Sequence, residues 1–338
     1  MLKTRERIEL FLVNVTVIEG RHFPKKYKYS AVHVRVGNKK KCTPICFTSE
    51  SPYFNEFYVF EFSTTMEQFL DTSITLTAFR PRRRLLSRKI IGYVTLDAAT
   101  VWSAEDHQFY HKWAILLPPV KDVKMAVRGF LKVDIAIIRK GEKFKIPIID
   151  IQSTDEIEGN FLQTHSYTAE RLRANYTFIV YYGIAFGKGK YSDLKYTVET
   201  ERDLPKIYVE ILFAGRKGRT STIKGNSNPV WNESIVIPEY FPPLCQRIRI
   251  NVFNRDKYSR TLISSRIVDL SLICNYDEPG FLPTFGPTFF HFYVKRNKNE
   301  TYVGKILIAF YTNLPLNESD VVKHVEVKKT SGIREVSL

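Results

Sequence analysis

The chain has 338 residues, of which 44% are hydrophobic and 25% charged, with 14% aromatic residues and a formal net charge of +16. This composition excludes collagen-like, disulfide-rich and disordered chains, and the length predicts two domains that each bury a core. The aromatic content favours β-structure. The placement of the positive charge bears more on function than its sum.

Short apolar or alternating segments follow one another at regular spacing, which is typical of an all-β protein. The first segment has an apolar face that includes Phe11, Val13 and Val15 and a mixed opposite face, as in a sandwich strand. Eight strands are expected in the first half, enough for two packed sheets. They cover residues 8–18, 31–36, 42–48, 56–62, 73–79, 89–96, 112–116 and 129–138.

The strand rhythm stops after the first half and then resumes. The interruption is acidic, with Asp155, Glu156 and Glu158, and predicts a linker with some structure of its own. Further strands are expected at residues 177–186, 206–215, 218–224, 232–238, 247–254, 266–272, 288–294 and 304–312. The predicted organisation is a domain at 1–143, a linker at 144–173, a domain at 174–314 and a loose tail at 315–338.

The two halves are related in sequence. Residues 51–56 (SPYFNE) precede an apolar strand in the first half, and residues 228–233 (NPVWNE) do so in the second. Each half also ends with a strand that begins at a glycine, Gly129 or Gly304. A repeat at domain length indicates duplication of a whole domain.

This turn before a strand resembles that of C2 domains, eight-stranded β-sandwiches that often bind phospholipid. An ordered set of segments also resembles two consecutive C2 domains from the interior of ferlins, the second and third. The segments are residues 11–24 (FLVNVTVIEGRHFP), 128–138 (RGFLKVDIAII), 155–162 (DEIEGNFL) and 280–287 (GFLPTFGP). The resemblance implies two eight-stranded antiparallel C2-type sandwiches, joined by a short structured linker like the one between those ferlin domains.

Ferlins are long, tail-anchored proteins that act in membrane fusion, trafficking and repair. The resemblance covers two of their domains, so we expect either a short relative or one part of a longer ferlin. No apolar run approaches the roughly 20 residues of a membrane helix, and the start of the chain lacks the cleavage site of a signal peptide. We therefore expect a cytoplasmic protein, peripheral on membranes.

Calcium-binding C2 domains gather aspartates from two loops at one end, because calcium needs roughly six to eight oxygen ligands. The resemblance places Arg80 and Arg82 at metal positions of the first domain. The facing loop, residues 23–30, contains no acidic residue. We expect no calcium in this domain.

The second domain keeps one aspartate at a metal position, Asp256, whereas Asn254 and Leu262 occupy two others. Asp256 with Asp203 or Asp193 is the candidate for a weak metal site. The alternative, which we favour, is that Asp256 caps its loop. We expect no cofactor for either domain.

The positive charge is concentrated in the first domain. Residues 1–145 carry 26 lysines and arginines against 14 acidic residues, whereas the remaining residues carry 25 against 21. Basic residues near an anionic membrane contribute about 1 kcal/mol each before salt screening, and two leucines within the basic loop are expected to anchor in the interface. The candidate membrane- or phosphate-binding residues are Lys25, Lys26, Lys28, Lys39, Lys40, Lys41, Arg80, Arg82, Arg83, Arg84, Leu85, Leu86, Arg88 and Lys89.

These features predict that fixed cations replace calcium in binding acidic phospholipid, with phosphoinositides as candidates, because guanidinium groups bind phosphate with two parallel hydrogen bonds. The alternatives are a solvated loop without a ligand and an interaction scaffold whose basic surface captures an acidic protein. The second domain is expected to dock on the first or on a protein partner. We expect no nucleic-acid partner, because no recognised nucleic-acid module is present.

Other constellations are weaker. Cys42 and Cys46 form half of a zinc-site pattern without a second pair at ligand spacing. His107 and His111 have helical metal spacing, but their segment resembles the ferlin run that leads into a strand. No nucleophile, phosphate-loop or dinucleotide motif is present, so we expect no enzyme.

Overall fold

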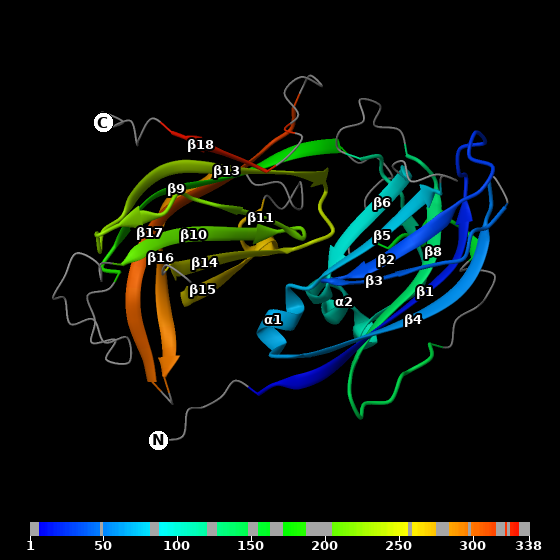
Figure 1. The fold of residues 1–338 in the computed structure, drawn as a ribbon, viewed down its shortest axis with the longest axis horizontal. Helices are drawn as coiled ribbons and strands as arrows, with labels where there is room; N and C mark the ends of the chain where they lie inside the picture. Colours follow the sequence, from blue (N-terminus) through cyan, green and yellow to red (C-terminus); the bar gives the residue numbers. More distant parts are fainter. Residues whose placement is uncertain are drawn as a thin grey trace. The chain divides into compact units, whose positions relative to one another are not determined.

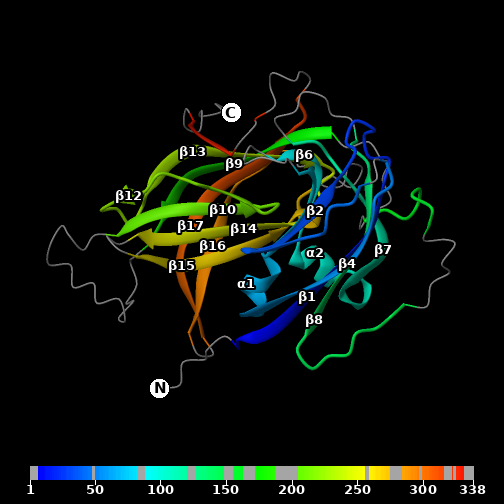
Figure 2. The ribbon, with the colours of Figure 1, turned by 45° about the vertical axis from the view of Figure 1, so that its right-hand side comes forward.

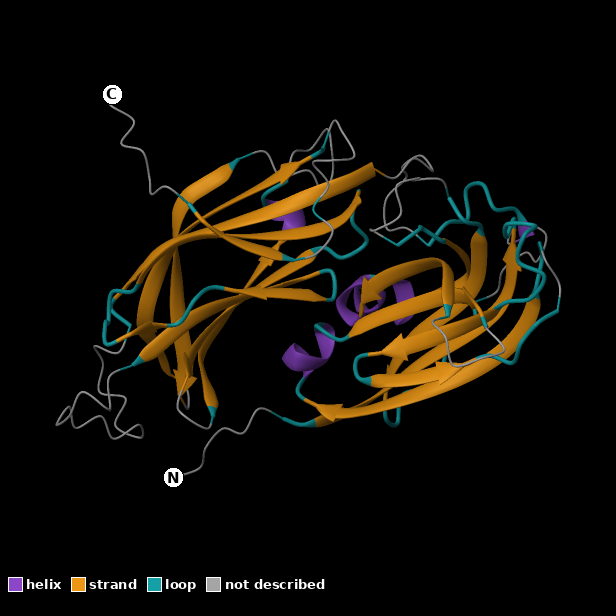
Figure 3. Cartoon of the chain, turned by 45° about the horizontal axis from the view of Figure 1, so that its top comes forward, coloured by secondary structure: helices purple, strands orange, loops and turns teal. Residues whose placement is uncertain are grey.

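The computed structural model describes most of both halves of the chain: residues 7–47, 50–81, 88–119, 127–147, 155–162, 172–186, 205–255, 259–274, 284–296, 299–315, 322 and 325–330. It contains two compact units, whose main parts are Arg5–Glu170 and Arg171–Leu338. Each unit is a sandwich of two antiparallel sheets (Figure 1). The prediction of an all-β chain with two antiparallel sandwiches is confirmed, and Figure 3 shows how little helix accompanies the strands.

The first unit has sheets in the order β4-β1-β8-β7 and β3-β2-β5-β6 (Figure 2). Its strands are β1 Glu9–Arg21, β2 Ala31–Val36, β3 Lys39–Cys42, β4 Tyr53–Thr64, β5 Ser73–Arg80, β6 Lys89–Asp97, β7 Gln108–Ile115 and β8 Phe130–Arg139. Alternate β1 residues, including Phe11 and Val13, are fully buried as the pattern predicts. Two short helices, α1 (Met66–Leu70) and α2 (Ala98–Ser103), cap this core, where Phe11 stacks on Phe69 with ring centroids 4.1 Å apart.

The second unit has sheets in the order β11-β10-β14-β15, with β12 also on β10, and β16-β17-β9-β13-β18. Its strands are β9 Leu172–Ile184, β10 Lys206–Phe213, β11 Arg216–Arg219, β12 Ile223–Lys224, β13 Val230–Phe241, β14 Arg247–Arg255, β15 Arg260–Asp269, β16 Phe285–Arg296, β17 Asn299–Asn313 and β18 Glu326–Lys329. Large aromatic side chains fill the space between the sheets, among them Tyr176, Phe178, Trp231 and Phe310.

The repeated turn motif has the same local structure in both units. Its asparagines, Asn55 and Asn232, adopt positive φ angles of 48° and 47°, a conformation that asparagine tolerates better than most residues. The prolines of the motif, Pro52 and Pro229, each accept a backbone hydrogen bond from a glycine of the neighbouring first strand, at 2.7 and 2.8 Å. The motif therefore specifies how the chain enters the second long strand of each unit.

Two of the expected elements are wrong in detail. The strand predicted at residues 42–48 is instead the lysine-rich β3, because Pro44 cannot donate a ladder hydrogen bond beyond Thr43. The tail is not loose throughout, because β18 pairs with β13 from Glu233 to Val236. The polar sequence of β18 hides it from a search for apolar strands.

Part of the predicted linker packs against the first unit instead of forming structure of its own. Within it, Phe161 forms an isolated parallel bridge to Trp113 of the edge strand β7. The Trp113 amide donates to the Asn160 carbonyl at 2.9 Å, and the Leu162 amide donates to the Trp113 carbonyl at 2.8 Å. Leu162 is buried. The segment 155–162 therefore packs as an edge of the first unit.

Candidate functional site

Three connections of the first unit meet at one end of its sandwich. The amides of Ser30 and Cys46 each donate to the other residue's carbonyl at 2.9 Å, which joins the β1–β2 connection to the β3–β4 connection. At this same end, β2 begins beside the end of β5, where Ala31 pairs with Phe79. The β5–β6 connection leaves from there, so the described ends of the three connections lie at one end of the sandwich.

The β1–β2 connection presents exposed lysines on a fixed base. Lys25, Lys26 and Lys28 are exposed, whereas Tyr27 between them is buried. The segment is tied down by the Phe23 amide, which donates to a carbonyl of the β3–β4 connection. An acidic side chain does reach this loop: Glu50 lies 3.2 Å from the Lys25 ammonium. Two of the three lysines, Lys26 and Lys28, have no ion pair among the described residues.

Arg88, directly before β6, is held in a defined orientation. Its guanidinium lies 2.7 Å from Nε2 of His33 and 5.2 Å from the centre of the Phe79 ring, and His33 itself stacks on Phe79. Burial, with further contributions from Lys40 and Arg88, lowers the pKa of His33 to about 4. A neutral imidazole accepts a hydrogen bond from Arg88, and this contact fixes the orientation of the guanidinium.

The rest of the β5–β6 connection is described only at its ends. Arg80 pairs with Lys89 across the strands, and its Nε is buried with no hydrogen-bond partner in the described part of the chain. The predicted residues from Arg82 to Leu86 lie outside the described residues. Their contact with a ligand stays a prediction.

The three lysine side chains of β3 point in two different directions. The Lys41 ammonium donates to the Val59 carbonyl at 3.1 Å, and the Lys39 ammonium donates to the Glu61 carbonyl, both on the exposed edge of β4. Lys40 pairs with Arg35 of β2 and is exposed. Lys39 and Lys41 thus have structural partners, whereas Lys40 faces solvent beside Arg35.

Sequence reasoning missed two apolar residues at this end. Phe47 is 80% exposed and Ile45 is 47% exposed, and Phe47 lies 6.2 Å from the ring of Tyr29 in the lysine-bearing connection. The expected strand 42–48 concealed them, because a strand accounts for apolar residues by burying them. The signal was Pro44, which ends β3 and leaves the following apolar residues without a strand.

The weak metal candidates of the second unit, Asp203 and Asp256, lie outside the described residues. Nearby, Asn254 caps the start of β10 by accepting a hydrogen bond from the Lys206 amide at 2.9 Å. Among the described residues, no group of three histidine, cysteine or acidic side chains is placed to hold a metal ion. Cys42 and Cys46 are not joined by a disulfide bond.

The two histidines with metal spacing have separate partners. His107 stacks on Trp102, with ring centroids 3.7 Å apart. His111 lies beside Asp134, with its Nδ1 3.0 Å from the carboxylate and its amide donating to the same oxygen at 2.6 Å. Burial raises the pKa of Asp134, against the opposing effect of His111. The His107 contact lies in the turn just before β7, whereas the His111 contact lies at the irregularity within β7 between Phe109 and Lys112.

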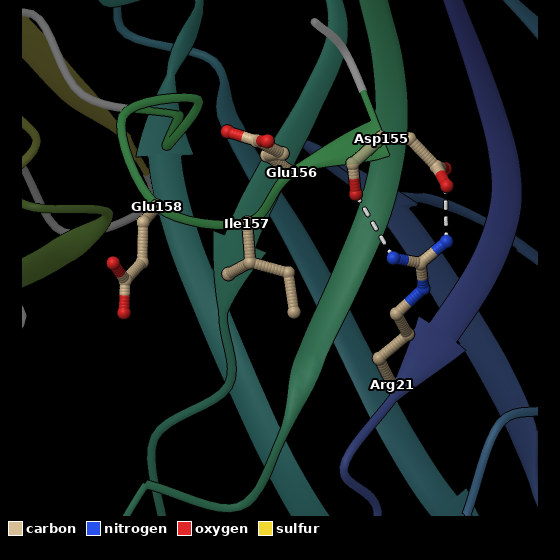
Figure 4. A pocket seen from close by; sticks show the side chains of 5 residues that line it. All are labelled: Arg21, Asp155, Glu156, Ile157 and Glu158. Carbon is tan, nitrogen blue, oxygen red and sulfur yellow. Dashed lines mark hydrogen bonds and ion pairs between the residues drawn. The ribbon is translucent and has the colours of Figure 1, made fainter. Parts of the chain in front are cut away.

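A shallow hollow lies beside Arg21 at the end of β1 (Figure 4). The Arg21 guanidinium donates to the carbonyl and to the carboxylate of Asp155, both at 2.9 Å, and Lys132 also reaches this carboxylate at 3.3 Å. Hydrogen bonds from Lys132 and Arg21 lower the pKa of Asp155. Glu156 and Glu158 point away from Arg21 in Figure 4. The hollow is therefore the contact between the acidic segment and the first unit.

Comparison with known proteins supports the duplication. The family model described as the C2 domain matches residues 11–116 and 190–278, more than half of the chain and one match in each unit. In the described part of the chain, no helix combines the length and apolar character needed to cross a membrane.

Curated relatives are ferlins. The chain is 29% identical to Fer-1-like protein 4 of Mus musculus over 84% of its length, and 27% identical to Myoferlin of Xenopus tropicalis over 94%. It spans only 14% and 18% of those two proteins. Among solved structures, the two consecutive C2 domains of Extended-Synaptotagmin 2 share 14% identity over 96% of each chain, with a TM-score of 0.32 that is too low to carry an argument. The chain belongs to the C2-domain family, as a tandem pair of C2 domains whose curated relatives are ferlins.

Proposed function

We propose that the first C2 domain binds acidic phospholipid membranes without calcium, as a non-enzymatic module in membrane trafficking or fusion. The observation that carries this proposal is the meeting of exposed lysines, an oriented arginine and exposed apolar side chains at one end of the sandwich. Lys26 and Lys28 supply charge, and Phe47 supplies an apolar side chain beside them. Interfacial binding draws on both terms.

In this proposal, cationic side chains attract the anionic headgroups, as a bound calcium ion does in calcium-binding C2 domains. Arg88 rests on the neutral His33 and the face of Phe79, so its fork of donors is oriented before a phosphate arrives. Arginine matches phosphate geometry with two parallel hydrogen bonds, which favours phosphoinositide headgroups over a diffuse anionic surface. Pre-orientation reduces the entropy that binding would otherwise cost.

The test is co-sedimentation with phosphatidylserine and phosphoinositide vesicles, in calcium and in chelator. We expect equal binding in both, a decline as salt rises, and a loss of about tenfold or more when Arg80, Arg82, Arg83 and Arg84 become alanine. A smaller pair, Lys26→Ala with Lys28→Ala, should weaken binding several-fold. Its matched control is Lys140→Ala with Lys143→Ala, which removes the same charge from exposed positions beyond the far end of β8.

One observation favours an acidic protein as the second candidate ligand. Cations of this domain already hold carboxylates, since Lys25 pairs with Glu50 and Arg21 pairs with Asp155. If the wild-type protein binds neither phosphatidylserine nor phosphoinositide vesicles, the membrane proposal is contradicted. Capture of an acidic peptide by the same lysines would then be the function to pursue.

A further inference from the structure

The longest hairpin of the second unit continues past the sheet that supports it. β17 pairs with β9 only from Lys305 onward, where Lys305 faces Ile184. The residues of β17 before that point pair with β16 alone among the described strands. Figure 1 shows β16 and β17 continuing side by side as a two-stranded ribbon. The end of this ribbon lies beyond the end of β9.

Aromatic side chains cover one face of the ribbon and are open to solvent. Tyr293 and Tyr302 are 48% and 41% exposed, and their rings meet edge to face with centroids 5.6 Å apart. The exposed His291 lies 5.9 Å from Tyr302. Burial and the neighbouring Tyr293 raise the pKa of Tyr302, which favours its uncharged form. Tyrosine side chains, which have an apolar ring and a polar hydroxyl, favour the interface between lipid and water.

The second sheet holds these aromatic residues in place. The Ser264 hydroxyl of β15 donates to the Tyr293 carbonyl at 2.7 Å. The Arg266 guanidinium of the same strand donates to the His291 carbonyl at 2.9 Å and lies 4.9 Å from the centre of the Phe290 ring. The ribbon is therefore a braced element, so little conformational entropy is lost when its rings are immobilised.

The sequence around the turn of the hairpin is basic. Lys295 and Arg296 close β16 and Lys298 follows, whereas Glu300 is the single acidic residue from Val294 to Thr301. Tyrosines followed by basic residues at the far end match the layers of an anionic bilayer surface, in which aromatic rings lie at the headgroup level and cations meet lipid phosphates. This complementarity favours a phospholipid surface as the occupant of the exposed face.

The turn of this hairpin lies at the same end of the second unit as the β9–β10 and β14–β15 connections. The β9–β10 connection leaves from Ile184 and returns at Lys206, which lies beside Asn254 near the end of β14. The turn between Arg255 and Arg260 is at the same end. This end of the second unit corresponds to the one that carries the basic connections in the first.

We propose that the β16–β17 hairpin is a second membrane contact, which places Tyr293 and Tyr302 in the headgroup region of an anionic bilayer. The contact rests on the membrane association proposed above, but it uses different residues in the other domain. It assigns a lipid-facing role to a domain whose sequence suggested protein docking.

The test places a fluorescent reporter on the hairpin of the full chain. Tyr302→Trp should shift its emission to shorter wavelength and be quenched by brominated lipid when phosphatidylserine vesicles are added. Tyr311→Trp, at the opposite end of β17, is the matched control and should respond no more than the wild-type chain. Replacing Tyr293 and Tyr302 with alanine should weaken vesicle binding by about tenfold, the effect of re-exposing parts of two large side chains.

The outcomes separate the two membrane contacts. Vesicle binding with no response of Trp at position 302 would overturn the hairpin contact and leave the basic site of the first domain standing. A response that persists after Lys26 and Lys28 become alanine would support a contact of the second domain in its own right. Absence of vesicle binding by the wild-type chain would overturn both proposals.

Discussion

The two C2 domains close the same side of their sandwiches in different ways. In the first, Lys39 and Lys41 of β3 reach across to carbonyls on the edge of β4. In the second, the strand β18 adds to the equivalent edge of β13 and lies against β11. An open strand edge invites unwanted pairing, and natural sheets block it with lysines or cover it. Duplicated domains have here reached both solutions.

A single position distinguishes the two solutions. Lys41 faces Val34 on β2, and Gly218 faces Ile211 at the matching place on β10. A Cβ on Gly218 would lie 2.3 Å from Cγ2 of Ile235 and 2.9 Å from Cγ1 of Val325. The absence of a side chain in the second domain thus makes room for the segment that covers its edge. The first domain closes its edge locally, whereas the second depends on residues that follow β13 at a great distance along the chain.

Removing β18 is expected to have the largest effect on the stability of the second domain. Truncation before Val325 leaves Glu233, only 2% exposed, without the Lys329 ammonium that lies 2.7 Å away. We expect the second domain to lose about 3 kcal/mol of stability, because unpairing a buried charge is costly. Urea unfolding followed by hydrogen exchange of each domain would measure the loss. Truncation after Thr330, which keeps β18, is the control, and equal stability of the two truncations would contradict the expectation.

A smaller effect is expected from exchanging the distinguishing residue. Gly218→Lys should displace Val325 and loosen β18, at a cost of about 2 kcal/mol typical of overpacking. The reciprocal change, Lys41→Gly, should cost the first domain about 1 kcal/mol, from a lost carbonyl contact and a glycine within a strand. Amide exchange at β13 reports the first change and exchange at β4 the second. Protection of β13 that is unchanged in Gly218→Lys would show that the glycine is not required there.

The mildest expected difference concerns pH. His33 has a lowered pKa in the first domain, so stability is complete above its unfolded value of 6.5 and declines as pH falls toward about 4. In the second domain, burial favours the neutral form of Glu233, but hydrogen bonds from Lys329 and Ser221 outweigh it and lower the pKa, so this contribution is lost only below 4.5. The first domain should therefore lose stability earlier on acidification.

Hydrogen exchange at several pH values would measure both domains in one sample. His33→Gln should remove the part of the decline between pH 6.5 and about 4 in the first domain while leaving the second unchanged. A first domain whose variant and wild type decline in parallel would show that another group controls its pH response.

The sequence predicts those parts of the fold whose residues alternate between an apolar core and another environment. β1 is found where the pattern of Phe11 and Val13 places it. The turn motif marks the entry to β4 and β13, because the turn requires a positive φ that asparagine tolerates. β3 and β18 escape such a search, because each pairs through its backbone while its polar side chains remain outside.

The candidate site is predictable in its charge but not in its shape. The lysines of residues 23–30 could be expected at one end of a sandwich from the resemblance to C2 domains. The exposure of Phe47, the orientation of Arg88 by His33 and the use of Lys41 as an edge cap depend on contacts between segments far apart in the chain. Local sequence does not encode such contacts.

The bridge between Phe161 and Trp113 determines where a fragment that contains the complete first domain has to end. Asn160 donates from its side chain to the His111 carbonyl and accepts from the Lys112 ammonium, both at 2.8 Å. A fragment cut at residue 143 would leave the edge of β7 unpaired, whereas a fragment that runs to Leu162 would carry its own covering. The acidic segment 155–162 therefore belongs with the first domain in any exchange of domains.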